Sequence, residues 1–384
     1  MRSFGALLVF IALTMIAWGV YGPVVREGQI GMQGSSLRPF ICVGLAYFFI
    51  AVLAPGILLR MSGEAGHWSM TGTIWSLLAG AAGAIGALGI ILALAFRGSP
   101  LYVMPLVFGG APVVNTFLTM YWARSYKHVS PWFLAGLILV IFGAVSVLVF
   151  RPHGHGPAGE KISITQKGDA ISVDVTRSGE DSPTHYEAAS VEELEHDHPD
   201  VFKLYNVHRR FTARELALVI VFTLMTAIAW GVYGPTLHRG QMAMAGSRLR
   251  PLMCVGAAYF LIAVIVPTLL LLQWDEPGQF TVSGTIWSLG GGTAGALGAL
   301  GIIMAFTFGG KPIFVMPLVF GGAPVVNTFV SVMQAGNWDQ LHPLFFAGLI
   351  VVAAGAVSVL VFAPKADTHA ALSKPAPAEE TAPA

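Results

Sequence analysis

Two asparagines in apolar surroundings are the first residues whose chemistry suggests a site. Asn115 and Asn327 each follow a proline by three positions, Pro112 and Pro324 respectively. A proline inside a helix removes one backbone hydrogen bond and frees a carbonyl in the preceding turn. A side-chain amide beside such a carbonyl offers donors and an acceptor to a hydroxyl-rich or amide-bearing solute. The alternative is that each amide only links neighbouring helices, as polar residues in membrane bundles do.

Aromatic residues next to glycines and a proline form a second candidate. The motif WGVYGP occurs at 18–23 and again at 230–235. Its glycines and proline predict that two helices break there, and broken helices at corresponding positions are typical of transport sites. The aromatic residues that could stack on a ring or a sugar face are Trp18, Tyr21, Trp230 and Tyr233. The alternative is an aromatic belt or gate near the membrane–water interface.

The apolar stretches offer little chemistry for catalysis. They contain no Asp, Glu, Lys, Arg or His, whereas an active site needs convergent acids, bases, nucleophiles or metal ligands. Proton-driven carriers keep an ionisable side chain inside the membrane, and nucleotide-driven pumps need a phosphate loop that is absent here. We therefore expect no enzyme and no cofactor, and facilitated movement of a neutral or zwitterionic solute. Coupling through a loop residue such as Glu27 is the less favoured alternative.

The composition is typical of an integral membrane protein. The 384 residues are 55% hydrophobic and 11% charged, with a mean hydropathy of +0.71, whereas soluble domains carry about 25% charged residues. The formal net charge is +1 and the basic residues are scattered, so nucleic acid is not an expected partner. Cys42 and Cys254 lie in apolar stretches and are expected to pack as small apolar residues.

The two halves of the chain repeat one another without a gap. Adding 212 to the position of Trp18 gives Trp230, and the same step relates Pro152 to Pro364. The block VMPLVFGGAPVVNTF occurs at 103–117 and again at 315–329. A repeat of this length indicates duplication of a whole unit rather than a solenoid.

Each half contains five stretches long enough to cross a bilayer core, which takes about 20 residues per helix. They are 4–25, 39–59, 72–96, 100–122 and 131–150, then 216–237, 251–273, 283–309, 312–333 and 343–363. Because five is odd, two such units insert with opposite orientation, as in many secondary transporters. The predicted fold is therefore all-α, with ten transmembrane helices as two inverted five-helix repeats.

Four segments follow from this division. The first repeat is 1–150, a soluble polar insert is 151–213, the second repeat is 214–364, and a disordered tail is 365–384. In the insert, apolar and polar residues alternate around Gly168-Asp169, which predicts a small β-hairpin. The acidic, His-containing run at 192–200 lacks a fixed ligand pattern, so solvated surface is favoured over a metal site.

The third stretch of each half carries glycines every three residues. These are Gly80, Gly83, Gly86 and Gly89, with Gly292, Gly295, Gly298 and Gly301 as their counterparts. Small residues on one helix face let another helix approach closely. We therefore expect these faces to be packing surfaces.

The charge distribution suggests an orientation. With the amino terminus inside, the short inner loops hold more Lys and Arg than the outer ones, as the positive-inside rule requires. Both termini are then cytoplasmic, and the plasma (bacterial inner) membrane is the expected location. The insert lies on the opposite side.

The region GAIGALGIILALAFRGSPLYVMPLVFGGAPVVNTF, followed by HVSPWFLAGLILVIFGAVSVLVF, resembles the EamA-type unit of the drug/metabolite transporter superfamily. The matching positions are Gly86, Gly89, Pro105, Pro112, Gly136 and Gly143, with Gly298, Gly301, Pro317, Pro324, Gly348 and Gly355 in the second half. The resemblance implies two five-helix halves around a central cavity that moves metabolites, amino acids, sugars or nucleotide-linked compounds.

The sequence thus predicts a transporter working by alternating access. Its expected partners are a small-molecule solute and the lipid bilayer, and a homodimer is compatible with this assignment. The alternative is a membrane scaffold or receptor that acts through the insert at 151–213.

Overall fold

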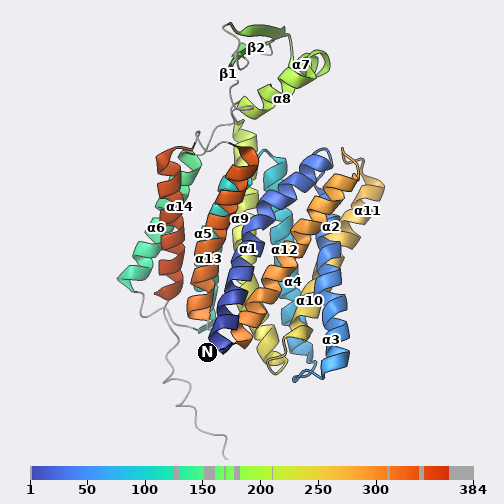
Figure 1. The fold of residues 1–384 in the computed structure, drawn as a ribbon, viewed down its shortest axis with the longest axis vertical. Coiled ribbons are helices and arrows are strands. Elements are labelled where there is room, and N and C mark those ends of the chain that lie inside the picture. Colours follow the sequence, from blue (N-terminus) through green and yellow to red (C-terminus); the bar gives the residue numbers. More distant parts are fainter. Residues whose placement is uncertain are drawn as a thin grey trace, which may run out of the picture.

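The computed structural model describes residues 2–123, 130–150, 161–167, 170–176, 182–209, 211–308, 312–336 and 341–362. Figure 1 shows a bundle of helices with a small domain beyond one of its ends. The predicted tail at 365–384 and the hairpin turn Gly168-Asp169 lie outside the described residues.

Helices occupy all ten predicted apolar stretches. In the first half they are α1 (Arg2–Gly31), α2 (Leu37–Phe48) continuing through the π-helical segment η1 (Phe49–Leu53) into α3 (Ala54–Ser62), α4 (Met70–Ala95), α5 (Pro100–Ala123) and α6 (Pro131–Val149). In the second half they are α9 (Ala213–Ala243), α10 (Leu249–Tyr259) continuing through η3 (Phe260–Ile265) into α11 (Val266–Gln273), α12 (Val282–Thr307), α13 (Pro312–Ala335) and α14 (Pro343–Val361).

Seven helices of the described residues are long and apolar enough to cross a membrane. They are Phe4–Gly31, Leu37–Met61, Met70–Ala95, Pro100–Trp122, Ala213–Ala243, Leu249–Gln273 and Val282–Ala305. Three shorter apolar helices are Pro131–Val147, Leu318–Gln334 and Pro343–Val359. These lengths and compositions are compatible with an integral membrane protein.

The prediction that two helices break at the WGVYGP motifs is wrong. Helix α1 continues through Pro23 to Gly31, and α9 continues through Pro235 to Ala243. Each proline removes only one backbone donor, and neighbouring helices can compensate for such a loss within a packed bundle. Because both helices run about six residues beyond the predicted ends, they also include charged residues that sequence analysis had placed in loops.

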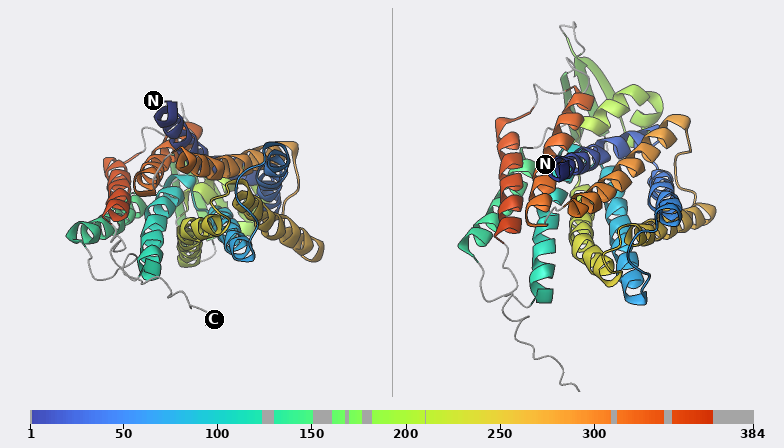
Figure 2. Two further views of the ribbon diagram at one scale, coloured as in Figure 1. Left: turned by 90° about the horizontal axis from the view of Figure 1, so that it is seen from below. Right: turned by 60° about the horizontal axis from the view of Figure 1, so that its bottom comes forward.

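The two halves interlock through their first helices. Helix α1 packs along α12 and α13, whereas α9 packs along α4 and α5. Helices α6 and α14 pair with each other at one side of the bundle (Figure 2). There the Ser146 hydroxyl donates to the Leu344 carbonyl at 2.9 Å, and the Ser358 hydroxyl donates to the Trp132 carbonyl at 3.0 Å.

Carboxylates from one half cap helices of the other half. Glu276, in the loop after α11, accepts from the backbone N–H groups of Ser36 and Leu37 at 2.8 and 3.0 Å, at the start of α2. Glu64, after α3, accepts from the N–H of Arg248 at 2.9 Å and of Leu249 at 3.3 Å, at the start of α10. Helix starts leave N–H groups unpaired and favour negative charge, so both helices gain a cap from the opposite half.

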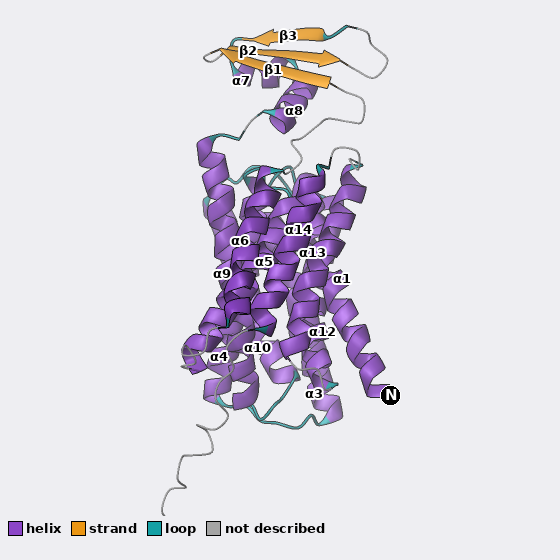
Figure 3. Ribbon diagram, turned by 90° about the vertical axis from the view of Figure 1, so that its left-hand side faces the viewer, coloured by secondary structure: helices purple, strands orange, loops and turns teal. Residues whose placement is uncertain are grey.

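The described residues of the insert fold into a small domain of three strands and two helices. Strands β1 (Lys161–Lys167), β2 (Ala170–Thr176) and β3 (Thr184–Ala188) form an antiparallel sheet in the order β1-β2-β3. The predicted hairpin is present, with Ile164 opposite Val173. Helices α7 (Val191–Asp197) and α8 (Pro199–His208) pack on the sheet, and Figure 3 shows α8 between the sheet and the bundle.

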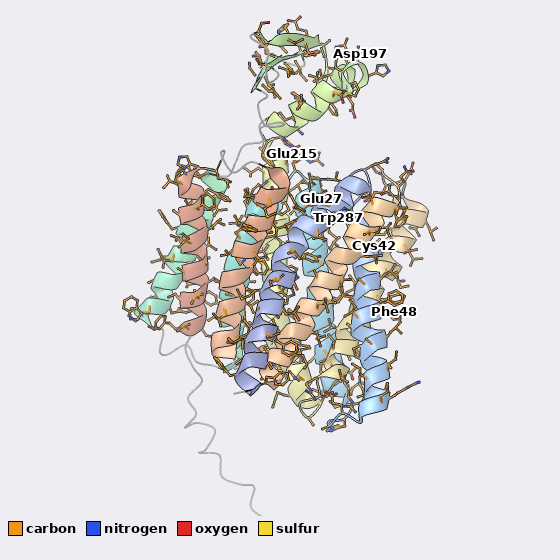
Figure 4. All side chains as sticks on the ribbon, viewed as in Figure 1. Glu27, Cys42, Phe48, Asp197, Glu215 and Trp287 are labelled. Atoms are coloured by element: carbon orange, nitrogen blue, oxygen red, sulfur yellow. The ribbon has the colours of Figure 1, made fainter. Side chains whose placement is uncertain are left out.

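An ionic cluster joins the insert to the bundle. Arg97, between α4 and α5, lies 3.6 Å from the Glu215 carboxylate and donates to the Arg209 carbonyl at 3.2 Å. Its guanidinium also lies 4.9 Å from the ring centre of Phe211. The starts of α5 and α9 are therefore at the end of the bundle that carries the insert, where Figure 4 shows Glu215.

Candidate functional site

A cavity of about 520 Å³ lies between the two halves of the bundle. Its lining comes from α1, α2, α4, α5, α9, α10, α12 and α13 and is mainly apolar and aromatic, with a few polar side chains. Pockets that hold small molecules usually have volumes of about 300 to 1,000 Å³ and this kind of lining. The cavity is therefore large enough for a small metabolite.

All four aromatic residues predicted for the site line this cavity. The indole N–H of Trp18 donates to the Gly295 carbonyl at 3.3 Å, and that of Trp230 donates to the Gly83 carbonyl at 3.2 Å. Each indole is thereby held by a glycine of the opposite half. Trp18 and Trp230, like Tyr21 and Tyr233, thus face the interior of the bundle.

Two further tyrosines add to this aromatic lining. The rings of Tyr47 and Tyr259 stack with their centres 3.7 Å apart, and both residues line the cavity. They are counterparts under the 212-residue repeat, so they meet where the two halves face each other. Sequence analysis missed this pair because nothing in a single half indicates that its tyrosine meets its own copy.

The two predicted asparagines have different environments. Asn115 lines the cavity and is partly exposed. Asn327 is fully buried, and its side-chain amide donates to the Pro100 carbonyl at 2.8 Å. Pro112 and Pro324 are both buried within their helices and do not line the cavity. Asn115 thus borders the cavity, whereas Asn327 links two helices.

The two copies of WGVYGP also differ. A Cβ atom on Gly234 would meet nothing within 4 Å, and Gly234 lines the cavity. A Cβ atom on its counterpart Gly22 would lie 2.6 Å from Cγ of Met104. The aromatic residues of both motifs line the cavity, but only the Gly234 end of the second motif borders open space, whereas the Gly22 end of the first is packed against α5.

Two further pairs of counterpart residues differ in the same way: one member is packed and the other borders the cavity. Gln29 is buried and donates from Nε2 to the Ile91 carbonyl at 2.9 Å, whereas its counterpart Gln241 lines the cavity. Arg26 donates from Nη1 to the Leu94 carbonyl at 2.9 Å, whereas its counterpart His238 is exposed at the cavity. Among these described residues, those at one end of the bundle are packed, and we call this the closed end; those at the other, hollow end border the cavity.

The hollow end is the one opposite the insert. The cavity residues of α5 and α9, such as Trp122 and Gln241, belong to the final turns of those helices. Both helices start at the insert end, where Arg97 and Glu215 pair. Glu27, near the end of α1, lies toward the insert end in Figure 4.

Sequence analysis missed the charged part of the lining. His238 and Arg239 line the cavity within α9, although the sixth apolar stretch was expected to end at 237. The available signal was the change from Arg26-Glu27 to His238-Arg239 in an otherwise matching framework. The expected absence of charge from the helices is therefore wrong for α1 and α9.

No protein-family model matches the chain, and no curated protein matches it. The resemblance to the EamA-type unit therefore stays a prediction based on the glycine and proline positions.

Proposed function

We propose that the protein is a secondary-type carrier in the plasma membrane that moves a small metabolite by alternating access through the central cavity. The proposed architecture is ten transmembrane helices in two inverted five-helix repeats, of the EamA-like kind. Sequence analysis takes the solute to be neutral or zwitterionic. In the predicted orientation, with the amino terminus in the cytoplasm, the cavity faces the cytoplasm.

The observation that carries this proposal is that counterpart residues of the two halves have different environments: one is packed and the other borders the cavity. Gly22 is packed and Gly234 borders the cavity, although both belong to WGVYGP. The same holds for Gln29 and Gln241, and for Asn327 and Asn115. If the two halves exchanged conformations, the closed end would open and the open end would close, as in inverted-repeat carriers.

The contacts between the halves support such an exchange, because they occur in matching pairs. Thr14 donates to the Gly298 carbonyl at 3.2 Å, and its counterpart Thr226 donates to the Gly86 carbonyl at 3.0 Å. The helix caps by Glu64 and Glu276 form a second matching pair. These matching contacts can persist while the residues toward either end of the bundle exchange their packing partners.

Paired cysteine probes test the proposed exchange. Thr116 lines the cavity, whereas its counterpart Thr328 lies at the closed end and does not line it; both side chains are almost fully buried, at 3% and 6% exposed. In a background with Cys42 and Cys254 replaced by alanine, we expect Thr116→Cys to react with a small thiol reagent from the cavity end only. Thr328→Cys should react slowly, and only from the insert end. The measurement is the labelling rate in proteoliposomes with reagent added on one side.

A third substitution makes the test reciprocal. Asn327→Ala removes the 2.8 Å hydrogen bond to Pro100, which joins α13 to the start of α5 at the insert end. We expect it to speed labelling of Thr328→Cys and to slow labelling of Thr116→Cys. A rate increase at both positions would indicate general loosening, and access to both probes from the same side would contradict alternating access.

The second candidate function is a scaffold or receptor that acts through the insert. The observation in its favour is that the insert has its own core, with Ile171, Val173 and Leu194 almost fully buried. We expect a chain in which 154–206 is replaced by a short Gly/Ser linker to keep the labelling pattern of both probes, since Arg209 and Glu215 remain. Loss of that pattern in a correctly inserted chain would favour the second candidate.

A further inference from the structure

Arg239 is held in a fixed position at the cavity by two tryptophans. Its guanidinium carbon lies 3.6 Å from the ring centre of Trp122 and 5.1 Å from that of Trp75. The two rings meet edge to face, with centres 5.6 Å apart. Cation–π contacts of this kind stabilise an arginine against the ring face, so residues of α4, α5 and α9 together position this group.

In the part of the chain that the structure describes, no carboxylate pairs with this guanidinium. Among the described residues Arg239 makes no hydrogen bond and no ion pair, and no Asp or Glu of this part of the chain lines the cavity. An arginine stacked by its face on a ring keeps its in-plane N–H donors available, and their fork matches a carboxylate. Arg239 therefore brings an unused, oriented anion-binding group to the cavity.

This arrangement exists in one half only. The counterpart of Arg239 under the 212-residue repeat is Glu27, and the counterpart of Trp122 is Gln334. The rest of the helical framework matches closely, for example at the stacked pair Tyr47 and Tyr259. Arg239 and Trp122 are thus not part of the sequence that the two halves share.

We propose that the transported solute carries a carboxylate, which Arg239 binds, together with a flat apolar body that contacts the aromatic lining. This inference rests on the proposed carrier function. It keeps the zwitterion that the sequence predicts, adds a monocarboxylate, and replaces the purely neutral solute. Trp18 and Trp230 supply ring faces, and the side-chain amide of Asn115 supplies a further polar contact. A purely neutral solute would leave the guanidinium buried beneath it without a partner, which is unfavourable.

The test compares acids with their neutral amides on the full-length protein in an uncharged detergent. The probes are phenylacetate and indole-3-acetate, phenylacetamide and indole-3-acetamide, and phenylalanine as the zwitterion. A ligand that binds the folded state raises the melting temperature by mass action. We expect the acids or the zwitterion to stabilise the native chain and to bind at least about tenfold more tightly than the amides, the usual effect of a charge-assisted contact.

Three variants connect that binding to Arg239. Arg239→Gln should remove the preference for acids, whereas Arg239→Lys should keep part of it because the charge remains without the planar fork. Arg60→Gln is the matched control, since Arg60 is an exposed basic residue at the end of α3 and does not line the cavity. The melting temperature of each variant without ligand shows whether it folds.

Several results would overturn the proposal. These are equal binding of acids and amides, unchanged binding by Arg239→Gln, or no stabilisation by any carboxylate at millimolar concentration. A lipid phosphate is the other anion that a membrane arginine can bind. If only short-chain phosphatidylglycerol, and not phosphatidylcholine, stabilises the protein through Arg239, the residue is a lipid anchor. The cysteine probes at 116 and 328 do not involve Arg239, so the carrier proposal is tested independently.

Discussion

Replacing Glu64 with alanine is expected to lower the free energy of unfolding by about 3 kcal/mol, the usual cost of removing one partner from a buried ion pair. The side chain of Glu64 is 6% exposed and lies 3.6 Å from the guanidinium of Arg250, which is itself 12% exposed. It also accepts from the Ser247 hydroxyl at 2.7 Å and from the N–H groups that start α10. The variant removes the acceptor of these donors and the anion beside Arg250, whose guanidinium keeps only its neutral acceptors, the Ala65 carbonyl at 3.3 Å and the Ser247 hydroxyl at 3.1 Å.

The measurement is chemical unfolding in detergent at pH 7. Glu195→Ala is the matched control, because Glu195 is exposed on α7 and surface substitutions usually change stability by less than about 0.5 kcal/mol. Equal stability of the two variants would show that the cap at the start of α10 contributes little to the fold.

The effect of Glu64 should also depend on pH. Burial by itself raises the pKa of this carboxyl, but hydrogen bonds from Ser247 and from the N–H groups of Arg248 and Leu249 outweigh it, so the pKa lies below its ordinary value of 4.5. Because the folded-state pKa is below the unfolded-state pKa, the stabilisation is complete well above pH 4.5 and is lost as the pH falls through the lower value. The gap between native chain and Glu64→Ala should therefore shrink from pH 6 to pH 3.

Gly86→Val is expected to have the second large effect. A Cβ atom at Gly86 would lie 2.2 Å from Cδ1 and Nε1 of Trp230, so the indole must leave its place and lose its hydrogen bond to Gly83. Overpacking of this kind costs roughly 1–3 kcal/mol. Since Trp230 lines the cavity, we expect solute-dependent stabilisation to fall as well.

The control for this prediction is Gly5→Ala, at a helical glycine whose Cβ would meet nothing within 4 Å. It should be neutral or slightly stabilising, because alanine favours the helix more than glycine does. Thermal unfolding with and without a stabilising solute measures both effects. A Gly86→Val protein that melts and binds like the native chain would show that Trp230 is not held where the structure has it.

Much of the helical framework can be predicted from hydropathy. A backbone in an apolar environment must satisfy its own hydrogen bonds, so long apolar stretches become helices. The repeat also indicates the packing surfaces, since glycines such as Gly86 and Gly298 lie directly against Trp230 and Trp18. Helix ends were less predictable, because α1 and α9 continue past the glycines and proline that suggested a break.

The site is only partly visible in the sequence. The residue types in WGVYGP and the repeated asparagines Asn115 and Asn327 pointed to α1, α9, α5 and α13, which all contribute to the cavity lining. Identical sequences cannot show which copy borders open space, and only the packing of α5 against Gly22 distinguishes it from Gly234.

Composition, hydropathy and the 212-residue repeat were sufficient to determine a helical membrane-type chain of two related halves, since these properties depend on local sequence. The one-sided cavity, the caps from Glu64 and Glu276, and the meeting of Arg239 with Trp122 depend on contacts between residues far apart in the chain. Such contacts form only when the two halves pack together, because the two partners of each contact lie on different halves of the chain.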